Sequence, residues 1–251
     1  MEYICEVKNI SKRFHTINNE TKAIEDLSFN VKKGEIVSIV GPSGSGKSTV
    51  LSLIAGLEKP SEGEVIVNTG SIGFMFQKDQ LYEWRNIFKN CLLGLEVKHM
   101  DTDENREKVM SMLKKYGLYN FRNHYPSQLS GGMRQRAALV RTLAIEPDLL
   151  LLDEPFSALD YQTRLSVGNE VGQILRREKI TTILVTHDIP EAVSISDRVI
   201  VFTERPAKIK KEYAITFSQC QGERTPMKCR NTLELGEYFR QIWRDLDVEE
   251  E

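Results

Sequence analysis

A glycine-rich segment carrying one lysine and several hydroxyl groups is the part of the sequence best suited to hold phosphate. It has the spacing G-x-x-x-x-G-K-[ST], with Gly41, Gly46, Lys47 and Ser48 in the fixed positions. Glycines let successive backbone N–H groups turn towards phosphate oxygens, and a helix beginning near Lys47 adds the positive end of its dipole. Lys47 would then reach the β- and γ-phosphates, and Ser48 would hold Mg²⁺. A flexible Gly/Ser loop is the alternative. The expected nucleotide-contacting residues are Gly41, Pro42, Ser43, Gly44, Ser45, Gly46, Lys47, Ser48 and Thr49.

A pair of acids could supply the chemistry that a phosphate loop alone does not define. Asp153 and Glu154 directly follow four leucines, 149–152, which are typical of a strand buried on both faces. Asp153 is placed to bind the Mg²⁺ that Ser48 also touches. Glu154 points to the other side of the strand and could polarise a water for in-line attack on the γ-phosphorus. A turn with two solvated acids is the alternative.

Alternating and helical patterns indicate the elements that position these groups. The first two expected strands should form one antiparallel sheet, and the last two a hairpin. A helical block from 86 to 117 lies between two α/β portions, which indicates an inserted subdomain. Strands are expected at 3–10, 23–31, 36–40, 63–67, 71–76, 149–152, 180–185, 198–202 and 207–215. Further helices are expected at 49–55, 134–145, 161–177 and near 233–243.

Three of the expected helices have capping residues next to polar groups of interest. Ser130 is suited to be the N-cap of the helix 134–145, and the turn 157–160 is suited to cap the helix 161–177. Asp188, which follows His187, is suited to cap the helix that begins after it. By themselves, Ser130-Gly-Gly would be a plain helix cap and His187 a structural histidine. Phe14, a lone aromatic after Lys12-Arg13, would by its type alone be expected in the core.

Composition limits the class of protein. The chain has 251 residues, 40% of them hydrophobic, which is ample for a buried core of one large or two small domains. Its 34 basic and 36 acidic side chains give a net charge of −2, which provides no general attraction to nucleic acid. The four cysteines have no metal-ligand spacing, and the first residues show no leader, so we expect reduced thiols in a cytoplasmic protein. Since no apolar run approaches the roughly 20 residues that span a bilayer, a membrane role requires a partner subunit.

Six motifs together resemble ATP-binding cassette (ABC) ATPases. Beside the phosphate loop and the acid pair, 128–136 resembles the signature segment, 157–160 the D-loop, 185–188 the switch histidine and 76–77 the Q-loop. The match extends from about residue 3 to 202. It implies the α/β fold of this P-loop class, with a mainly parallel core sheet, an N-terminal antiparallel sheet and a helical subdomain inserted at about 84–140. The ABC domain would be 1–215, and 216–251 a C-terminal helical extension.

The resemblance also implies ATP and Mg²⁺ as ligands and a head-to-tail dimer. Each ATP would lie between one phosphate loop and the signature segment of a second copy, whose N–H groups suit a γ-phosphate. The D-loop would couple the two sites, and the aromatic near the N-terminus would stack on adenine instead of packing in the core. The implied catalytic residues are Glu154, His187, Lys47 and Gln77, the metal ligands Ser48, Gln77 and Asp153, and the further nucleotide-binding residues Phe14, Ser130, Gly131, Gly132 and Asp160. Met133 stands where the signature usually has Gln, and Phe14 where Tyr is more frequent.

A single cassette is typical of an importer, and the segment 77–86 is similar to the nitrate, sulfonate and taurine group. Glu83 stands where that group often has Pro. The surface from Leu81 to Phe88 would receive a coupling helix of a transmembrane permease subunit, although Trp84 could be a core residue. A solute-binding protein would be an indirect partner, nucleic acid none, and the chain would lie on the cytoplasmic face of the membrane. A soluble cassette ATPase of DNA repair or translation is the alternative; a small-molecule kinase would not explain Ser130-Gly-Gly or His187.

Overall fold

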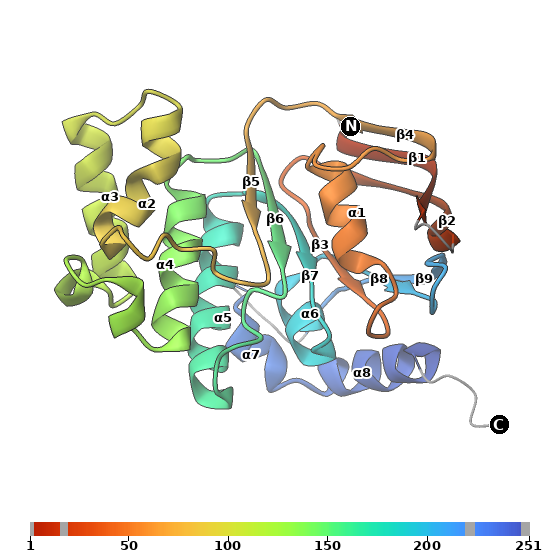
Figure 1. Ribbon diagram of the computed structural model, residues 1–251. Helices are drawn as coiled ribbons and strands as arrows, with labels where there is room; N and C mark the ends of the chain where they lie inside the picture. Colours follow the sequence, from red (N-terminus) through yellow and green to blue (C-terminus); the bar gives the residue numbers. More distant parts are fainter. Residues whose placement is uncertain (1–2, 16–19, 219–223, 247–251) are drawn as a thin grey trace. The chain divides into compact units, whose positions relative to one another are not determined.

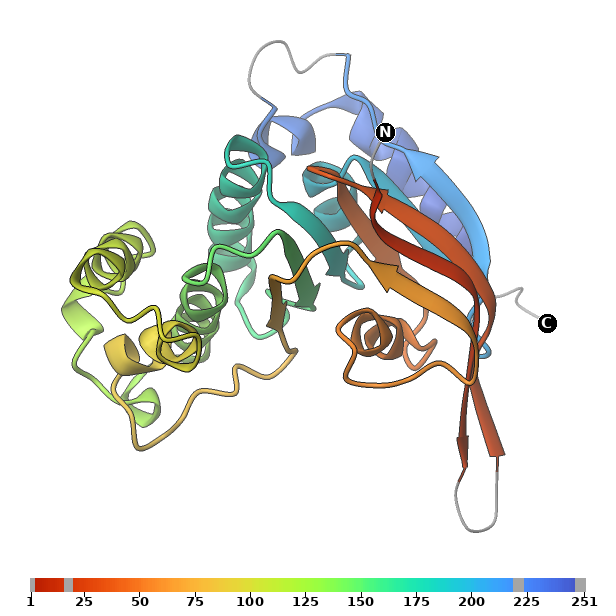
Figure 2. The same ribbon diagram turned by 90° about the horizontal axis from the view of Figure 1, so that it is seen from above.

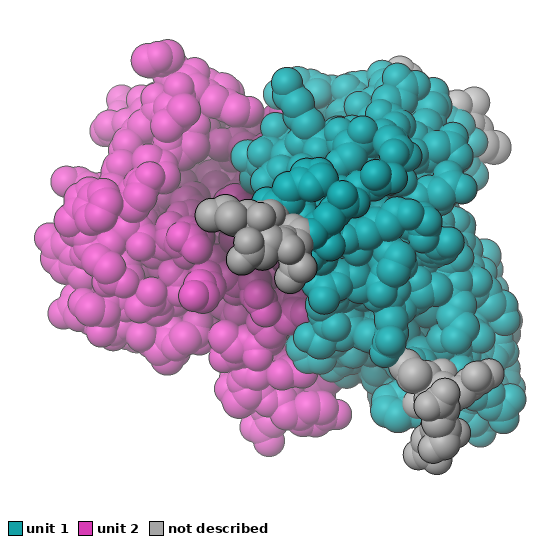
Figure 3. Space-filling view, turned by 45° about the vertical axis from the view of Figure 1, so that its right-hand side comes forward, with its two compact units in different colours: residues 1–70, 168–251 teal, residues 71–167 magenta. Residues whose placement is uncertain are grey.

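The computed structural model describes residues 3–15, 20–218 and 224–246 (Figure 1). The chain forms two compact units, one of Met1–Gly70 with Gly168–Glu251 and one of Ser71–Val167 (Figure 3). We call them unit 1 and unit 2 and describe each separately. None of the helices in these described ranges is long and apolar enough to cross a membrane.

Unit 1 begins with the antiparallel sheet that the alternating pattern predicts. β1 (Tyr3–His15) lies between β2 (Glu20–Lys32) and β4 (Glu62–Val67), as Figure 2 shows. Val7 is paired with residues of both neighbours, Phe29 and Val65. The prediction of an N-terminal antiparallel sheet is therefore confirmed, with strands several residues longer than expected.

The second sheet of unit 1 is mainly parallel. β3 (Ile36–Val40) runs parallel to β7 (Thr181–Val185) and β8 (Arg198–Phe202), while β9 (Ile209–Ala214) pairs antiparallel with β8, as the expected hairpin requires. All residues of β3 and β7 are buried, which explains their continuous apolar sequences. Because α1 (Lys47–Ile54) follows β3 and α6 (Ile189–Ile195) follows β7, their connecting loops lie at the carboxyl ends of neighbouring strands.

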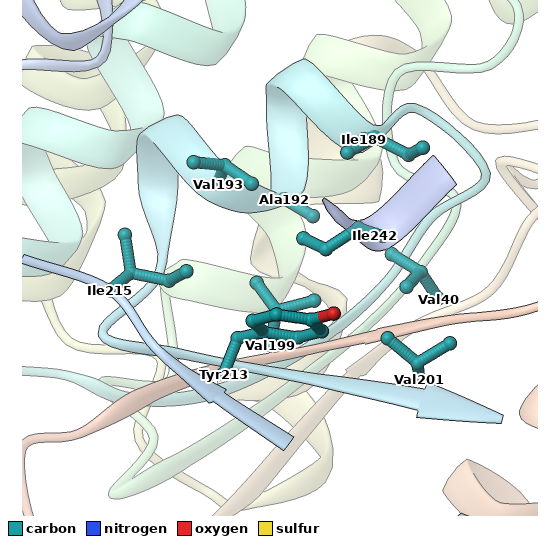
Figure 4. Close-up of a cluster of buried hydrophobic side chains, with 9 residues drawn as sticks. All are labelled: Val40, Ile189, Ala192, Val193, Val199, Val201, Tyr213, Ile215 and Ile242. Carbon is teal, nitrogen blue, oxygen red and sulfur yellow. The ribbon is translucent and has the colours of Figure 1, made fainter. Parts of the chain in front are cut away.

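Part of the described chain after β9 packs onto this sheet. It contains α7 (Pro226–Arg230) and α8 (Leu233–Leu246), and Ile242 of α8 is completely buried. Figure 4 shows its side chain among Val199, Tyr213 and residues of α6. The predicted helix near 233–243 is present and continues to Leu246. Residues 219–223 and 247–251, part of the expected extension, lie outside the described ranges.

Unit 2 holds a parallel strand pair and the helical block. β5 (Ile72–Met75) runs parallel to β6 (Leu149–Asp153). The helical block contains two helices instead of one continuous pattern, and the signature helix begins at Gly131, earlier than the expected 134. The inserted subdomain at 84–140 stays an interpretation within this unit. The remaining elements are α2 (Ile87–Val97), α3 (Asp103–Lys115), η1 (Tyr119–Phe121), η2 (Pro126–Gln128), α4 (Gly131–Leu143) and the start of α5 (Tyr161–Arg177).

Candidate nucleotide-binding site

The phosphate loop in unit 1 has the backbone that its glycines make possible. Gly44 and Gly46 have φ values of 74° and 98°, in the left-handed region that residues with a β-carbon rarely adopt. A β-carbon on Gly46 would also lie 3.0 Å from the carbonyl oxygen of Ala23. Since Gly46 is the N-cap of α1, the N–H groups of the first turn are donors of the kind that bind phosphate oxygens. The predicted strand, loop and helix are thus present in that order.

Lys47 is buried against this loop. Its Nζ donates hydrogen bonds to the carbonyl oxygens of Gly41, at 2.9 Å, and Pro42, at 2.7 Å, and lies 3.5 Å from the Ser45 hydroxyl. The ammonium group is therefore held within the loop itself, where an incoming phosphate would meet it. Ser48, in the first turn of α1, is exposed.

Phe14 differs from the expectation based on its residue type alone. Its side chain is 38% exposed at the end of β1, so the prediction that it packs in the core is wrong. Phe14 pairs with Thr21 of β2 near the end of β1, whereas the pairing of β1 with β4 ends at Ser11, so β4 does not extend alongside the ring. The Nζ of Lys12 lies 4.9 Å from the centroid of that ring. An exposed ring is what base stacking would require.

His187 lies in the loop between β7 and α6 and is exposed, which argues against a structural histidine in the core. The next residue, Asp188, is the N-cap of α6 as predicted: its Oδ1 accepts a hydrogen bond of 2.8 Å from the Glu191 N–H. The Asp188 N–H donates to the Thr186 hydroxyl at 3.0 Å. Residues on both sides of His187 are thus fixed by hydrogen bonds.

Unit 2 brings the acid pair together with the Q-loop glutamine. Asp153, at the end of β6, is only 6% exposed, whereas Glu154 is half-buried. Glu154 has a φ of 46°, which is unusual for a residue with a side chain and indicates backbone strain at this position. Gln77 Nε2 donates a hydrogen bond of 3.1 Å to Glu154 Oε2. The two predicted catalytic side chains of this unit are therefore in direct contact.

The signature segment lies beside the D-loop turn, also within unit 2. Ser130 is exposed and caps α4, its Oγ accepting a hydrogen bond of 3.4 Å from the Met133 N–H. A β-carbon on Gly132 would be 2.7 Å from Leu159 Cδ2, so glycine permits this close approach. Asp160 caps α5, its Oδ1 accepting a hydrogen bond of 3.0 Å from the Thr163 N–H, and hydrogen bonds with the side chain and the backbone of Thr163 lower the pKa of the Asp160 carboxyl group.

Oxygen donors of the kind that Mg²⁺ prefers occur in both units. Ser48 and His187 belong to unit 1, whereas Gln77, Asp153 and Glu154 belong to unit 2. The described residues contain no cluster of three or more acidic, histidine or cysteine side chains that could hold a metal alone. Mg²⁺ is usually bound by one or two protein oxygens together with substrate phosphates. The Ser48 hydroxyl and the buried Asp153 carboxylate are each an oxygen donor of this type.

The structure has two contacts of charged residues near this site that were not predicted from the sequence. One is Lys12 beside Phe14; the two lie at i and i+2 of a strand, a spacing that places side chains on one face and could have indicated the contact. The other is the pair of Asp79 and Arg134, which are 55 residues apart. No local signal connects that pair.

Comparison with known proteins identifies the family. The model of the ABC transporter family matches residues 24–157, more than half of the chain. An uncharacterized ABC transporter ATP-binding protein of Bacillus subtilis, YtlC, is 42% identical over 96% of this chain and 95% of its own length. The taurine import ATP-binding protein TauB of Roseobacter denitrificans is 36% identical over 98% and 95%.

The fold agrees with this result. A dimeric post-hydrolysis structure of the ATP-binding cassette MJ0796, bound to ADP and Pi, has a TM-score of 0.77 and 33% identity, covering 85% of this chain and 99% of that one. An antiparallel sheet, a mixed core sheet and a P-loop are the features of this class, so the predicted fold is confirmed. The chain belongs to the ABC transporter ATPases.

Proposed function

We propose that this chain binds ATP in a head-to-tail dimer and hydrolyses it to drive a transporter. The observation that carries this proposal is the contact of Gln77 with Glu154 beside the buried Asp153. A half-buried carboxylate with an amide donor can orient and polarise a water. Ser48 and Asp153 would hold Mg²⁺, which neutralises charge on the phosphates when bound. Ser130 to Gly132 would face the nucleotide of the second copy, consistent with the dimeric form of the structural relative.

The role of Glu154 can be tested with a matched pair of variants. Glu146 is the control: it lies shortly before β6, whereas Glu154 directly follows β6. The φ of Glu146 is 47°, nearly the same as the 46° of Glu154. We expect Glu154→Gln to bind ATP as the parent chain does, to lose ATP turnover by about 10²- to 10⁴-fold, and to accumulate as an ATP-bound dimer. Glu146→Gln should keep normal turnover. Phosphate release by the Glu154 variant at the parent rate would refute the assignment.

We further propose that the transporter is an importer for taurine, a sulfonate, nitrate or a related small solute, in which the chain lies at the cytoplasmic face of the membrane. The support comes from relatives: besides TauB, the aliphatic sulfonates import protein SsuB 1 of Rhodococcus jostii is 44% identical over 74% of this chain and 75% of its own length. These relatives do not favour the soluble ATPase of DNA repair or translation. A permease subunit would be the direct partner and a solute-binding protein an indirect one.

An exposed aromatic pair following the Q-loop is our candidate for the permease contact. Trp84 is 75% exposed, which overturns the alternative that it is a core residue, and it stacks on Tyr82 with ring centroids 4.7 Å apart. Exposed aromatic side chains of this kind are frequent anchors of interfaces. Leu81, by contrast, is buried.

Trp243 provides a matched control for Trp84. It is also exposed, at 52%, and stacked on a neighbouring ring, Phe239, at 5.7 Å. Trp84→Ala should keep the basal ATPase activity of the isolated chain but bind the permease more weakly by about 30-fold or more, the loss of a 2 kcal/mol interface anchor. Trp243→Ala should bind as the parent does. Equal permease affinity for all three proteins would contradict this surface assignment.

A further inference from the structure

A buried lysine lies beneath the exposed ring of Phe14. Lys12 is 8% exposed, although lysine is rarely buried without partners. Its Nζ donates hydrogen bonds to Glu58 Oε2 at 2.7 Å and to the Lys59 carbonyl oxygen at 2.8 Å. The same ammonium group lies 4.9 Å from the Phe14 ring centroid, within the range of a cation–π interaction.

We propose that Lys12 is a positioning residue for the base of the nucleotide. It holds the Phe14 ring from one side, so that the remaining surface of the ring can receive adenine. This inference rests on the proposed function, because it requires Phe14 to be the base platform. It adds a residue that determines how the platform is presented.

The first reason is the electrostatics of the ring. An ammonium group is attracted to the negative face of an aromatic ring, and the interaction is stronger where the cation is shielded from water. Lys12 is shielded, and its ammonium group approaches the Phe14 ring near the end of β1. Fixing the ring before the nucleotide arrives removes part of the ordering cost of binding.

The second reason is the connection to the phosphate loop. Glu58 and Lys59 lie in the segment that follows α1, the helix that begins at Lys47. Two further hydrogen bonds join β1 to this segment: the Ser61 N–H donates to the Ser11 carbonyl oxygen at 2.7 Å, and the Arg13 N–H to the Ser61 hydroxyl at 3.0 Å. Lys12 therefore links the ring to the segment after the phosphate-binding helix, and we infer that it helps fix the position of the base relative to the phosphates.

The test compares two ligands that differ in whether they carry a base. Calorimetric titration of the full chain in EDTA, where no hydrolysis occurs, gives dissociation constants for ATP and for inorganic tripolyphosphate. For Lys12→Met, which keeps the length of the side chain without its charge, the ATP constant should rise by about 3- to 10-fold. The tripolyphosphate constant should stay unchanged, and Lys12→Arg should restore ATP affinity.

Two further variants separate the possible outcomes. Phe14→Ala should weaken ATP alone, by about 5- to 150-fold, the value of one base–aromatic stack. Glu58→Gln removes an ion-pair partner that is 45% exposed but keeps the ammonium group, so it should bind both ligands normally. If Phe14→Ala binds ATP normally, the base platform itself is wrong. If Phe14→Ala loses ATP selectively but Lys12→Met binds it normally, or loses both ligands equally, only the role of Lys12 is overturned.

Discussion

The ion pair of Asp79 and Arg134 should stabilise unit 2 and hold the Q-loop segment against the signature helix. Asp79 follows Gln77 by two residues, and Arg134 lies in the second turn of α4. Arg134 donates hydrogen bonds of 2.9 and 3.2 Å to the two carboxylate oxygens of Asp79. The variants Asp79→Asn, Arg134→Met and their combination form a double-mutant cycle for this pair.

The magnitude of the coupling can be bounded from the geometry. Unit charges about 3 Å apart attract by about 1.4 kcal/mol in bulk water and several times more near a protein surface, while exposed pairs measure about 0.2 to 1 kcal/mol. The Arg134 and Asp79 side chains are 30% and 19% exposed, and their contact is bidentate. We therefore expect a coupling free energy of about 1 to 2 kcal/mol. The pair of Arg134 with Glu83, which is 53% exposed, should contribute about 0.5 kcal/mol or less.

Urea unfolding at pH 7 and pH 5 measures this coupling. Burial would raise the pKa of Asp79, but hydrogen bonds from Arg134 and from the Leu81 N–H outweigh it and leave the pKa below its usual value. A depressed folded-state pKa means that the stabilisation is complete above the unfolded value, near 3.9, and is lost as the pH falls through the folded one. The coupling should thus be equal at pH 7 and pH 5. A coupling below about 0.2 kcal/mol at pH 7, under the range measured for exposed pairs, would refute this reasoning.

Three other substitutions test the packing. Gly63→Ala should cost about 3 kcal/mol or more of unfolding free energy, because its φ is 78° and a β-carbon would lie 2.3 Å from the Asn9 carbonyl oxygen. Gly70 has nothing within 4 Å of such a β-carbon, so Gly70→Ala should leave the unfolding free energy unchanged. Equal urea midpoints for the two variants would count against the clash at Gly63. Arg224→Met should cost about 2 kcal/mol of unfolding free energy, since Arg224 donates a hydrogen bond to the Ser196 carbonyl oxygen at 2.6 Å. Arg240 is exposed, so Arg240→Met should leave the unfolding free energy unchanged. An equal loss in both variants would contradict the stabilising role of this hydrogen bond. Burial raises the pKa of the Cys91 thiol from 9.0 to about 12, so stability present below pH 9 is lost as the pH rises towards 12. The unfolding free energy of the parent chain should therefore fall with pH by about 1.4 kcal/mol per pH unit more than that of Cys91→Ala, as measured by urea unfolding between pH 9 and 11. An equal slope in the two proteins would exclude the Cys91 thiol as the source of this pH dependence.

Features that depend on a few neighbouring residues could be predicted from the sequence. The loop at 41–49 and the caps at Ser130, Asp160 and Asp188 each involve groups within six positions of one another, so their residue types define their geometry. The continuous leucines of β6 likewise required burial on both faces. Helix limits were less accurate: α4 starts at Gly131 despite two glycines, since the cap at Ser130 decides where it begins.

Exposure of single aromatic residues could not be predicted in this way. Phe14 was expected in the core from its type, and Trp84 could equally have been a core residue, yet both are exposed. A large apolar side chain is usually buried, but whether it is covered depends on elements far away in the sequence. For Phe14 the observed exposure agrees with the family resemblance, and the stacking on adenine that the resemblance implies stays a prediction.

The contacts that sequence analysis missed share a physical feature. Lys12 bonds to Glu58 across 46 positions, and Arg134 to Asp79 across 55. In each pair one charged residue lies two positions from a motif residue, Phe14 or Gln77, that the sequence did reveal. The motif residue would carry the contact with nucleotide or water, whereas the charge beside it fixes where that side chain lies. Changes at Lys12 or Asp79 should therefore alter affinity or coupling while the chemistry at Glu154 stays the same.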